Sequence, residues 1–447
     1  MGFGLIASLK NLAPILAYVA GVFFFFAALS GRVRWTLAFV VFLIPLRNVV
    51  ERLHGYPGGT KFLTILILAM AMGWLFLAMG QRIKFMDRSS LNLITIISVF
   101  YTFISLQLGN HYLGTSFFDI GDPRVQDWKN LCMMPLLFFI TCNTIQDKKW
   151  VWRIFTVMCL SMVLMAYYTI SQVSWFSSLV SRAKITGTFQ FLGPNEVAAF
   201  LNQYTLLMMS VYFFMRRGRN KMLLLALVLV NLYCLVFMYS RAAYLATAVG
   251  MLFLFAVKNK KLLIPLFLVV IFWQVALPQK VQERILETTN EYGELEQSAS
   301  SRLSIWAVSW EVFQKNPVTG IGWGVFRRLG YDLGDTHNIY LKILVEQGVL
   351  GLTIFLILCL CFLREGMNLY AKGDDDLSKG LGLGLAVATI VMVINNLFGD
   401  RWTYFELSSY LWIYAGLVSR LRIIAQEETK KGLTKVKGNK KSKLKFS

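Results

Sequence analysis

The chain has 447 residues, of which 56% are hydrophobic and only 15% are charged. A soluble domain carries about 25% charged residues, so this composition excludes a soluble globular protein of the same length. The formal net charge of +21 does not indicate a nucleic-acid-binding protein, because the basic residues form short clusters between apolar runs.

Apolar runs long enough to cross a bilayer recur along the chain, since one span needs about 20 mostly apolar residues. We predict an all-α, polytopic transmembrane helical bundle of 12–13 spans. The short link 31–34 leaves open a kinked or re-entrant pair in place of the first two spans. The predicted spans are 11–30, 35–50, 61–80, 89–107, 129–145, 154–174, 195–215, 222–240, 241–257, 262–278, 338–363, 381–398 and 406–423.

The basic clusters predict the orientation of these spans. They fall at alternate turns, and the segment 430–445 adds eight lysines. Because basic loops stay in the cytoplasm, this pattern predicts a multi-pass protein of the bacterial inner membrane with a cytoplasmic C-terminus. The periplasmic loops are then 51–60, 108–128, 175–194, the turn near Arg241, 279–337 and 399–405.

These loops divide the chain into five parts. They are N-terminal transmembrane helices at 1–174, central ones at 175–278, a long periplasmic loop at 279–337, C-terminal helices at 338–424 and a basic tail at 425–447. Within the long loop, Ser301 can cap an amphipathic helix from Arg302 to Gln314. Its apolar stripe fits either the membrane surface or packing against the spans; it comprises Leu303, Trp306, Trp310 and Phe313.

Three residues of the predicted periplasmic side are the main candidates for chemistry. His337 ends the long loop, and histidine exchanges protons near neutral pH. Arg241 lies at a very short turn between two spans, and Arg302 begins the amphipathic helix. Arginine binds phosphate oxygens through two hydrogen bonds, so together these residues indicate an anionic, phosphorylated ligand. Possible further substrate-binding residues are Asn195, Arg284, Asn338 and Arg401.

Other readings remain open for several of these features. Contact with lipid headgroups explains Arg284 and Arg401 equally well. The glycine-rich stretch 317–324 is either a plain turn or a loop whose backbone N–H groups approach an anion. The periplasmic loops contain no clustered carboxylates and no Cys/His group, so we expect no metal and no cofactor.

Two spaced patterns resemble the O-antigen ligase family, which includes related polysaccharide polymerases. The first is Arg241 followed by Leu245; the second is His337-Asn338, nine residues, Gly348, two residues and Gly351. The resemblance covers roughly 185–365 and is topological elsewhere. It implies a metal-independent membrane glycosyltransferase whose donor is a glycan on undecaprenyl diphosphate and whose acceptor is a sugar hydroxyl at the periplasmic face. His337 is then the general base, and Arg241 and Arg302 bind the diphosphate.

The resemblance favours a ligase, whose acceptor is lipid A-core, over a polymerase, which extends another lipid-linked repeat. A function of another class, a multi-span transporter or flippase, predicts ionisable groups in broken helices at mid-membrane. Here the candidate groups gather at the predicted periplasmic side. A scaffold that binds membrane lipids through its lysine tail is a third possibility, and it leaves Arg241 and His337 without a role.

Overall fold

The structure, a computed structural model, describes residues 2–117, 119, 121–173, 185–286, 297–330 and 335–443. The predicted loops 175–194 and 279–337 therefore lie partly outside the described residues, at 175–184, 287–296 and 331–334. Within the described ranges the chain is all-α and contains no strand, as the sequence predicts.

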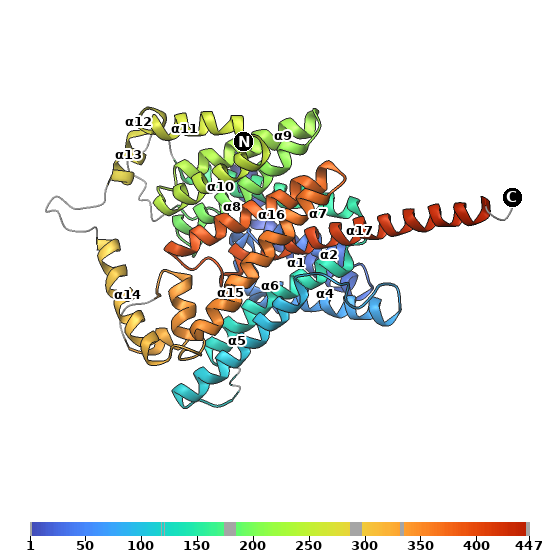
Figure 1. Ribbon diagram of the computed structural model, residues 1–447. Helices are drawn as coiled ribbons and strands as arrows, with labels where there is room; N and C mark the ends of the chain where they lie inside the picture. The colour runs from blue at the N-terminus through green and yellow to red at the C-terminus, as the bar shows by residue number, and fades with distance from the viewer. Residues whose placement is uncertain are drawn as a thin grey trace.

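The helices follow one another with short connections (Figure 1). The α-helices are α1 Gly2–Leu29, α2 Val33–Leu43, α3 Arg47–Val50, α4 Phe62–Met79, α5 Asn92–Leu113, α6 Pro123–Thr144, α7 Lys148–Gln172, α8 Pro194–Phe214, α9 Arg219–Val236, α10 Arg241–Lys258, α11 Leu263–Ile271, α12 Trp273–Ala276, α13 Gln279–Leu286, α14 Gln297–Lys315, α15 Ile339–Lys372, α16 Asp376–Asn395 and α17 Phe405–Lys443.

Fewer helices than predicted are long and apolar enough to cross a membrane. Nine described helices meet this test, and the bent pair formed by α2 and the segment 47–55 makes a tenth. By length and composition, the described residues thus contain nine or ten of the 12–13 predicted spans. The three predicted spans that fail the test are 129–145, 262–278 and 406–423.

The failures have two physical causes. The helices α6 and α17 pack against each other inside the bundle and carry charged residues that lower their hydropathy, among them Arg124 in α6 and Arg420 in α17. Both arginines are about 3% exposed and are paired with carboxylates, so these helices are interior elements rather than lipid-facing ones. The predicted span 262–278 is instead broken at Phe272 into the short helices α11 and α12.

The second predicted span, 35–50, is also broken. Its two halves meet at an angle of 99° beside Pro45, which cannot continue a helical hydrogen-bond ladder. A buried residue from a distant loop, Thr188, forms hydrogen bonds with the free backbone groups at the break. Thr188 donates its hydroxyl to the Pro45 carbonyl at 2.5 Å, and its own carbonyl accepts from the Asn48 N–H at 2.9 Å.

The predicted basic turns gather at one end of the bundle. Direct ion pairs join turns that are far apart in sequence, which places them on the same side: Arg34 with Asp147, Lys148 with Asp375 and Glu428, and Arg216 with Asp376. We call this the basic end. Figure 1 shows the end of α17 projecting from the bundle on the side opposite to α14.

The amphipathic helix of the long loop is present as α14 and begins five residues earlier than predicted. Its buried face consists of Ile305, Ser309 and Val312. Two residues of the predicted stripe, Leu303 and Trp310, are about half exposed at 52% and 49%. The stripe thus packs on the bundle only in part. Trp306 and Phe313 contact the core beneath α14, whereas Leu303 and Trp310 remain available to a membrane surface.

Candidate active site at the His337 turn

His337 lies in a turn, residues 335–338, that directly precedes α15. Its backbone adopts the left-handed conformation, with φ +50°, which a residue with a side chain adopts only when its surroundings hold it there. Hydrogen bonds on both sides supply that restraint. The hydroxyl of buried Thr336 donates to the Asn338 carbonyl at 2.9 Å, and Asn338 caps α15 by accepting from the N–H groups of Tyr340 and Leu341. The turn therefore presents an exposed imidazole from a fixed backbone.

Asp335 anchors the same turn through two cations. Its carboxylate accepts a hydrogen bond from Arg327 at 2.7 Å and lies 3.8 Å from the Lys342 ammonium. Lys342 also contacts Asp400 at 2.7 Å, so it joins the turn to the segment before α17. Burial alone would raise the pKa of Asp335, but the charges of Lys342 and Arg327 outweigh it and lower the pKa to about 2. Asp335 is therefore ionised throughout the physiological range.

Partial burial of the His337 imidazole favours its neutral form. Partial burial has the largest effect and lowers the pKa of His337; the charges of Arg302 and Arg401 lower it further, whereas Asp335 and Glu196 raise it. A neutral imidazole near pH 7 can accept a proton, as a general base must. Two of the predicted arginines thus act on His337 directly, one from α14 and one from the loop before α17.

The other contacts of these arginines show how they are positioned. Arg401 is buried and pairs with Glu196 of α8 at 2.8 Å. Arg302 lies one helical turn before Trp306 on α14, and the Trp306 indole N–H donates to the Thr336 carbonyl at 2.9 Å. That single hydrogen bond ties the helix bearing Arg302 to the backbone next to His337.

The remaining predicted residues occupy other positions. Arg241 is the first residue of α10, and it is not among the four charges that act most strongly on His337. Asn195 is in the first turn of α8, next to Glu196, and Arg284 lies in α13. The side-chain oxygen of Asn338 caps a helix, which by itself explains an asparagine at that position.

The glycine-rich stretch 317–324 is explained by close packing rather than by anion binding. It lies against a break in α15 at Gly348, whose φ of +65° and ψ of −168° are accessible in practice only to glycine. The N–H groups of Ile321 and Gly322 donate to backbone carbonyls of α15 at 2.9 Å, and the Trp323 N–H donates to the Ser105 carbonyl at 3.0 Å. These N–H groups therefore already donate to backbone carbonyls and are not available to an anion. Of the two interpretations offered by the sequence, the structure supports the plain turn.

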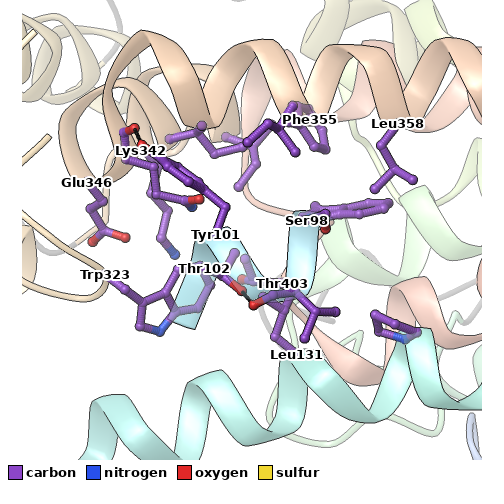
Figure 2. Close-up of a pocket in the computed structure, with 18 of the residues that line it drawn as sticks. Ser98, Tyr101, Thr102, Leu131, Trp323, Lys342, Glu346, Phe355, Leu358 and Thr403 are labelled. Atoms are coloured by element: carbon purple, nitrogen blue, oxygen red, sulfur yellow. Dashed lines mark hydrogen bonds between the residues drawn. The ribbon is translucent and has the colours of Figure 1, made fainter. Parts of the chain in front are cut away.

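Two adjoining cavities lie beside the turn. The larger has a volume of about 650 Å³ and the smaller about 40 Å³, and they share a wall formed by Trp323, Lys342, Glu346 and Thr403. Figure 2 shows Lys342, Glu346 and Trp323 gathered at one end of the small cavity, with Leu358 toward the other. None of the seven predicted site residues lines either cavity.

Cationic residues outnumber acidic ones in the wall of the large cavity. Three acidic residues line it, Asp127, Glu346 and Glu406. Seven cationic residues line it as well: Arg47, Lys61, Arg124, Lys129, Arg327, Arg328 and Lys342. Sequence reasoning missed this set because its members come from segments far apart in the chain. One signal was present, since Lys342 is an ionisable residue inside an apolar span, and such residues are functional candidates by default.

No group of three or more His, Cys, Asp or Glu side chains that could hold a metal ion occurs within the described ranges. At the turn, His337 can transfer a proton and the nearby guanidinium groups can stabilise charge.

The described ranges are all-α and include nine or ten helices apolar enough to cross a membrane, and polar groups converge beside a cavity lined mainly by cations. These features define a multi-pass membrane protein. Comparison with known families identifies it further. Residues 224–356, which include Arg241, Arg302, the His337 turn and the Gly348 break, match the family model described as O-antigen ligase. This match over the central part of the chain supports membership of the O-antigen ligase family, which implies a glycosyl-transfer enzyme. No curated protein matches the chain.

Proposed function

We propose that the protein transfers a glycan from undecaprenyl diphosphate to a sugar hydroxyl at the periplasmic face of the bacterial inner membrane. We propose further that it acts as an O-antigen ligase with lipid A-core as the acceptor. The observation that carries the proposal is the fixed, exposed His337 whose pKa is lowered beside the charges of Arg302 and Arg401. The match to the O-antigen ligase family over 224–356 supports the same chemistry.

The proposed reaction assigns each group one task. His337 accepts the proton of the acceptor hydroxyl as its oxygen forms a bond to the anomeric carbon of the donor. The bond between that carbon and the diphosphate breaks, and its electron pair leaves with undecaprenyl diphosphate. Arg302 and Arg241 stabilise the charge that develops on the leaving group, which is the largest catalytic contribution in many enzymes. The diphosphate bond supplies the energy, so no further co-reactant is required.

The test is a transfer assay with purified protein, a glycan on undecaprenyl diphosphate, and lipid A-core added or withheld. We expect label on lipid A-core and a loss of roughly 10²–10⁴-fold in His337→Gln, the usual contribution of a general base. His54→Gln and His111→Gln are matched controls, because both histidines are exposed and outside the turn.

Each result has a distinct meaning. Longer lipid-linked chains formed without lipid A-core would identify a polymerase of the same family instead. Well-folded protein that transfers glycan to neither acceptor would refute the proposal and favour the transporter class. Full activity in His337→Gln would remove His337 from the mechanism while leaving the transfer reaction in place.

A further inference from the structure

The large cavity is close to the catalytic turn but separate from the residues proposed to hold the donor. Arg327 and Lys342 line its wall, and both contact Asp335, two residues before His337. Neither Arg241 nor Arg302 is part of that wall. The cavity and the proposed diphosphate-binding residues are therefore distinct binding features that converge on the same turn.

Most of the cavity's positive charge is already neutralised. Five of its seven cations lie within 3.3 Å of a carboxylate oxygen; they are Arg47, Arg124, Arg327, Arg328 and Lys342. The other two, Lys61 and Lys129, form no ion pair with a described residue. The Lys129 ammonium donates only to the neutral Gln126 amide oxygen, at 3.2 Å.

These two lysines come from different elements and act on each other. Lys61 directly precedes α4, Lys129 lies in the second turn of α6, and the charge of Lys61 reaches the Lys129 ammonium. Because neither lysine forms an ion pair with a described residue, the two like charges raise each other's energy, and an anion bound between them would lower it. Aromatic residues of the same wall, Phe62, Phe191 and Tyr404, offer apolar faces beside this charge, as binding sites for organic molecules commonly do.

The chemistry of the proposed reaction decides which substrate the cavity suits. A general base must contact the acceptor hydroxyl. If the proposed transfer is a single in-line displacement, the diphosphate departs from the opposite face of the anomeric carbon. Arg302 acts on His337 from α14, outside the cavity wall, and is assigned to the diphosphate. The acceptor hydroxyl then approaches His337 from the large cavity, whose lining residues Arg327 and Lys342 contact Asp335.

We propose that the large cavity binds the acceptor glycan, and that Lys61 and Lys129 hold a phosphate or carboxylate group carried by that glycan. This inference rests on the proposed function, because it assigns the second substrate of the same reaction. It adds a specificity: the enzyme selects acceptors that bear an anionic group at a fixed distance from the reacting hydroxyl.

The experiment measures acceptor binding without donor, so that no turnover occurs. Wild-type protein in nanodiscs of zwitterionic lipid is titrated with lipid A-core, either native or treated with phosphatase. The same titrations are made with Lys61→Gln/Lys129→Gln and with a matched control, Lys260→Gln/Lys261→Gln, whose two lysines are exposed and do not line the cavity. Thermal unfolding of each variant establishes that it is folded.

We expect native acceptor to bind Lys61→Gln/Lys129→Gln about tenfold or more weakly than wild type, because two charge-assisted contacts are lost. Phosphatase treatment should weaken binding to wild type by a similar factor and should have little effect on this variant. The control variant should match wild type with both acceptors. Added salt should reduce the difference between native and treated acceptor, since the lysines are partly exposed.

Four outcomes would overturn the assignment. They are wild type that binds no acceptor, a double variant that binds native acceptor as tightly as wild type, losses that are equal for native and treated acceptor, and a control variant that weakens binding as much as the double variant does. Wild type that binds phosphorylated acceptor but makes no product would instead refute the proposed function and retain the site. Active wild type with an unchanged acceptor KM in the double variant would refute the site alone.

Discussion

Replacing Gly348 by alanine should destabilise the protein more than replacing any exposed glycine. A Cβ at this position would lie 2.2 Å from the Val318 carbonyl oxygen, well inside van der Waals contact. The backbone conformation, φ +65° and ψ −168°, is also one that side chains disfavour by about 1–3 kcal/mol. The substitution therefore combines conformational strain with a backbone clash.

The magnitude follows from what must move to relieve the clash. The segment 317–322 is held against the break by three backbone hydrogen bonds of 2.9 Å: Ile321 N–H to the Val345 carbonyl, Gly322 N–H to the Glu346 carbonyl, and Val349 N–H to the Pro317 carbonyl. Each is worth about 1 kcal/mol net. Losing them together with about 2 kcal/mol of strain gives a destabilisation of roughly 3–5 kcal/mol.

Substitutions of two further glycines distinguish the cost of backbone strain from the cost of the clash. Gly330 has φ +73° but open space around its Cβ, so Gly330→Ala should cost only about 1–2 kcal/mol. Gly55 has open space and no positive φ, so Gly55→Ala should be nearly neutral. The assay is thermal unfolding in detergent followed with a thiol-reactive dye, since all six cysteines are buried or half-buried in the folded protein. Equal unfolding temperatures for Gly348→Ala and Gly55→Ala would refute this account of the break.

Three further predictions concern the turn itself. Asp335→Asn removes a negative charge that raises the pKa of His337, so the acidic limb of the pH–rate profile should move to lower pH; an unmoved limb would exclude His337 as its source. Lys342→Met leaves the Asp400 carboxylate buried without its cation and should destabilise the protein by about 3–5 kcal/mol, measured by thermal unfolding, with most of the loss restored in Lys342→Met/Asp400→Asn. Trp306→Phe removes the hydrogen bond to the Thr336 carbonyl and should lower the rate of glycan transfer while leaving the unfolding temperature nearly unchanged. An unchanged transfer rate would show that other contacts hold α14.

The sequence was sufficient where hydrophobicity alone defines an element. The predicted spans 61–80 and 195–215 differ by one residue or less at each end from helices Phe62–Met79 and Pro194–Phe214. It was insufficient for α6 and α17, whose buried arginines pair with carboxylates that lie outside these two helices. A hydropathy count cannot distinguish a buried ion pair from two exposed charges. Arg420 illustrates this, because its partner Asp87 is 333 residues away.

For the candidate site, too, some residues could be predicted from the sequence and others could not. His337 and Arg302 could be named because residue type, position at a span end and family pattern agree. Lys342 and Asp400 could not be paired in advance, because 58 residues separate them and neither stands in a recognisable spacing. The large cavity is formed by the packing of several helices, among them α4 and α6. No short sequence pattern predicts how those helices pack.

The break at Pro45 has a consequence for how the protein is made. Backbone groups exposed inside a bilayer must find a partner within the protein, and here Thr188 supplies it from a position 143 residues later in the chain. At about 5–20 residues per second, the ribosome reaches Thr188 roughly 7–30 s after Pro45. During that interval the Pro45 carbonyl and the Asn48 N–H at the bend lack the hydrogen bonds that Thr188 later provides. The N-terminal helices should therefore complete their assembly only after the loop bearing Thr188 has left the ribosome.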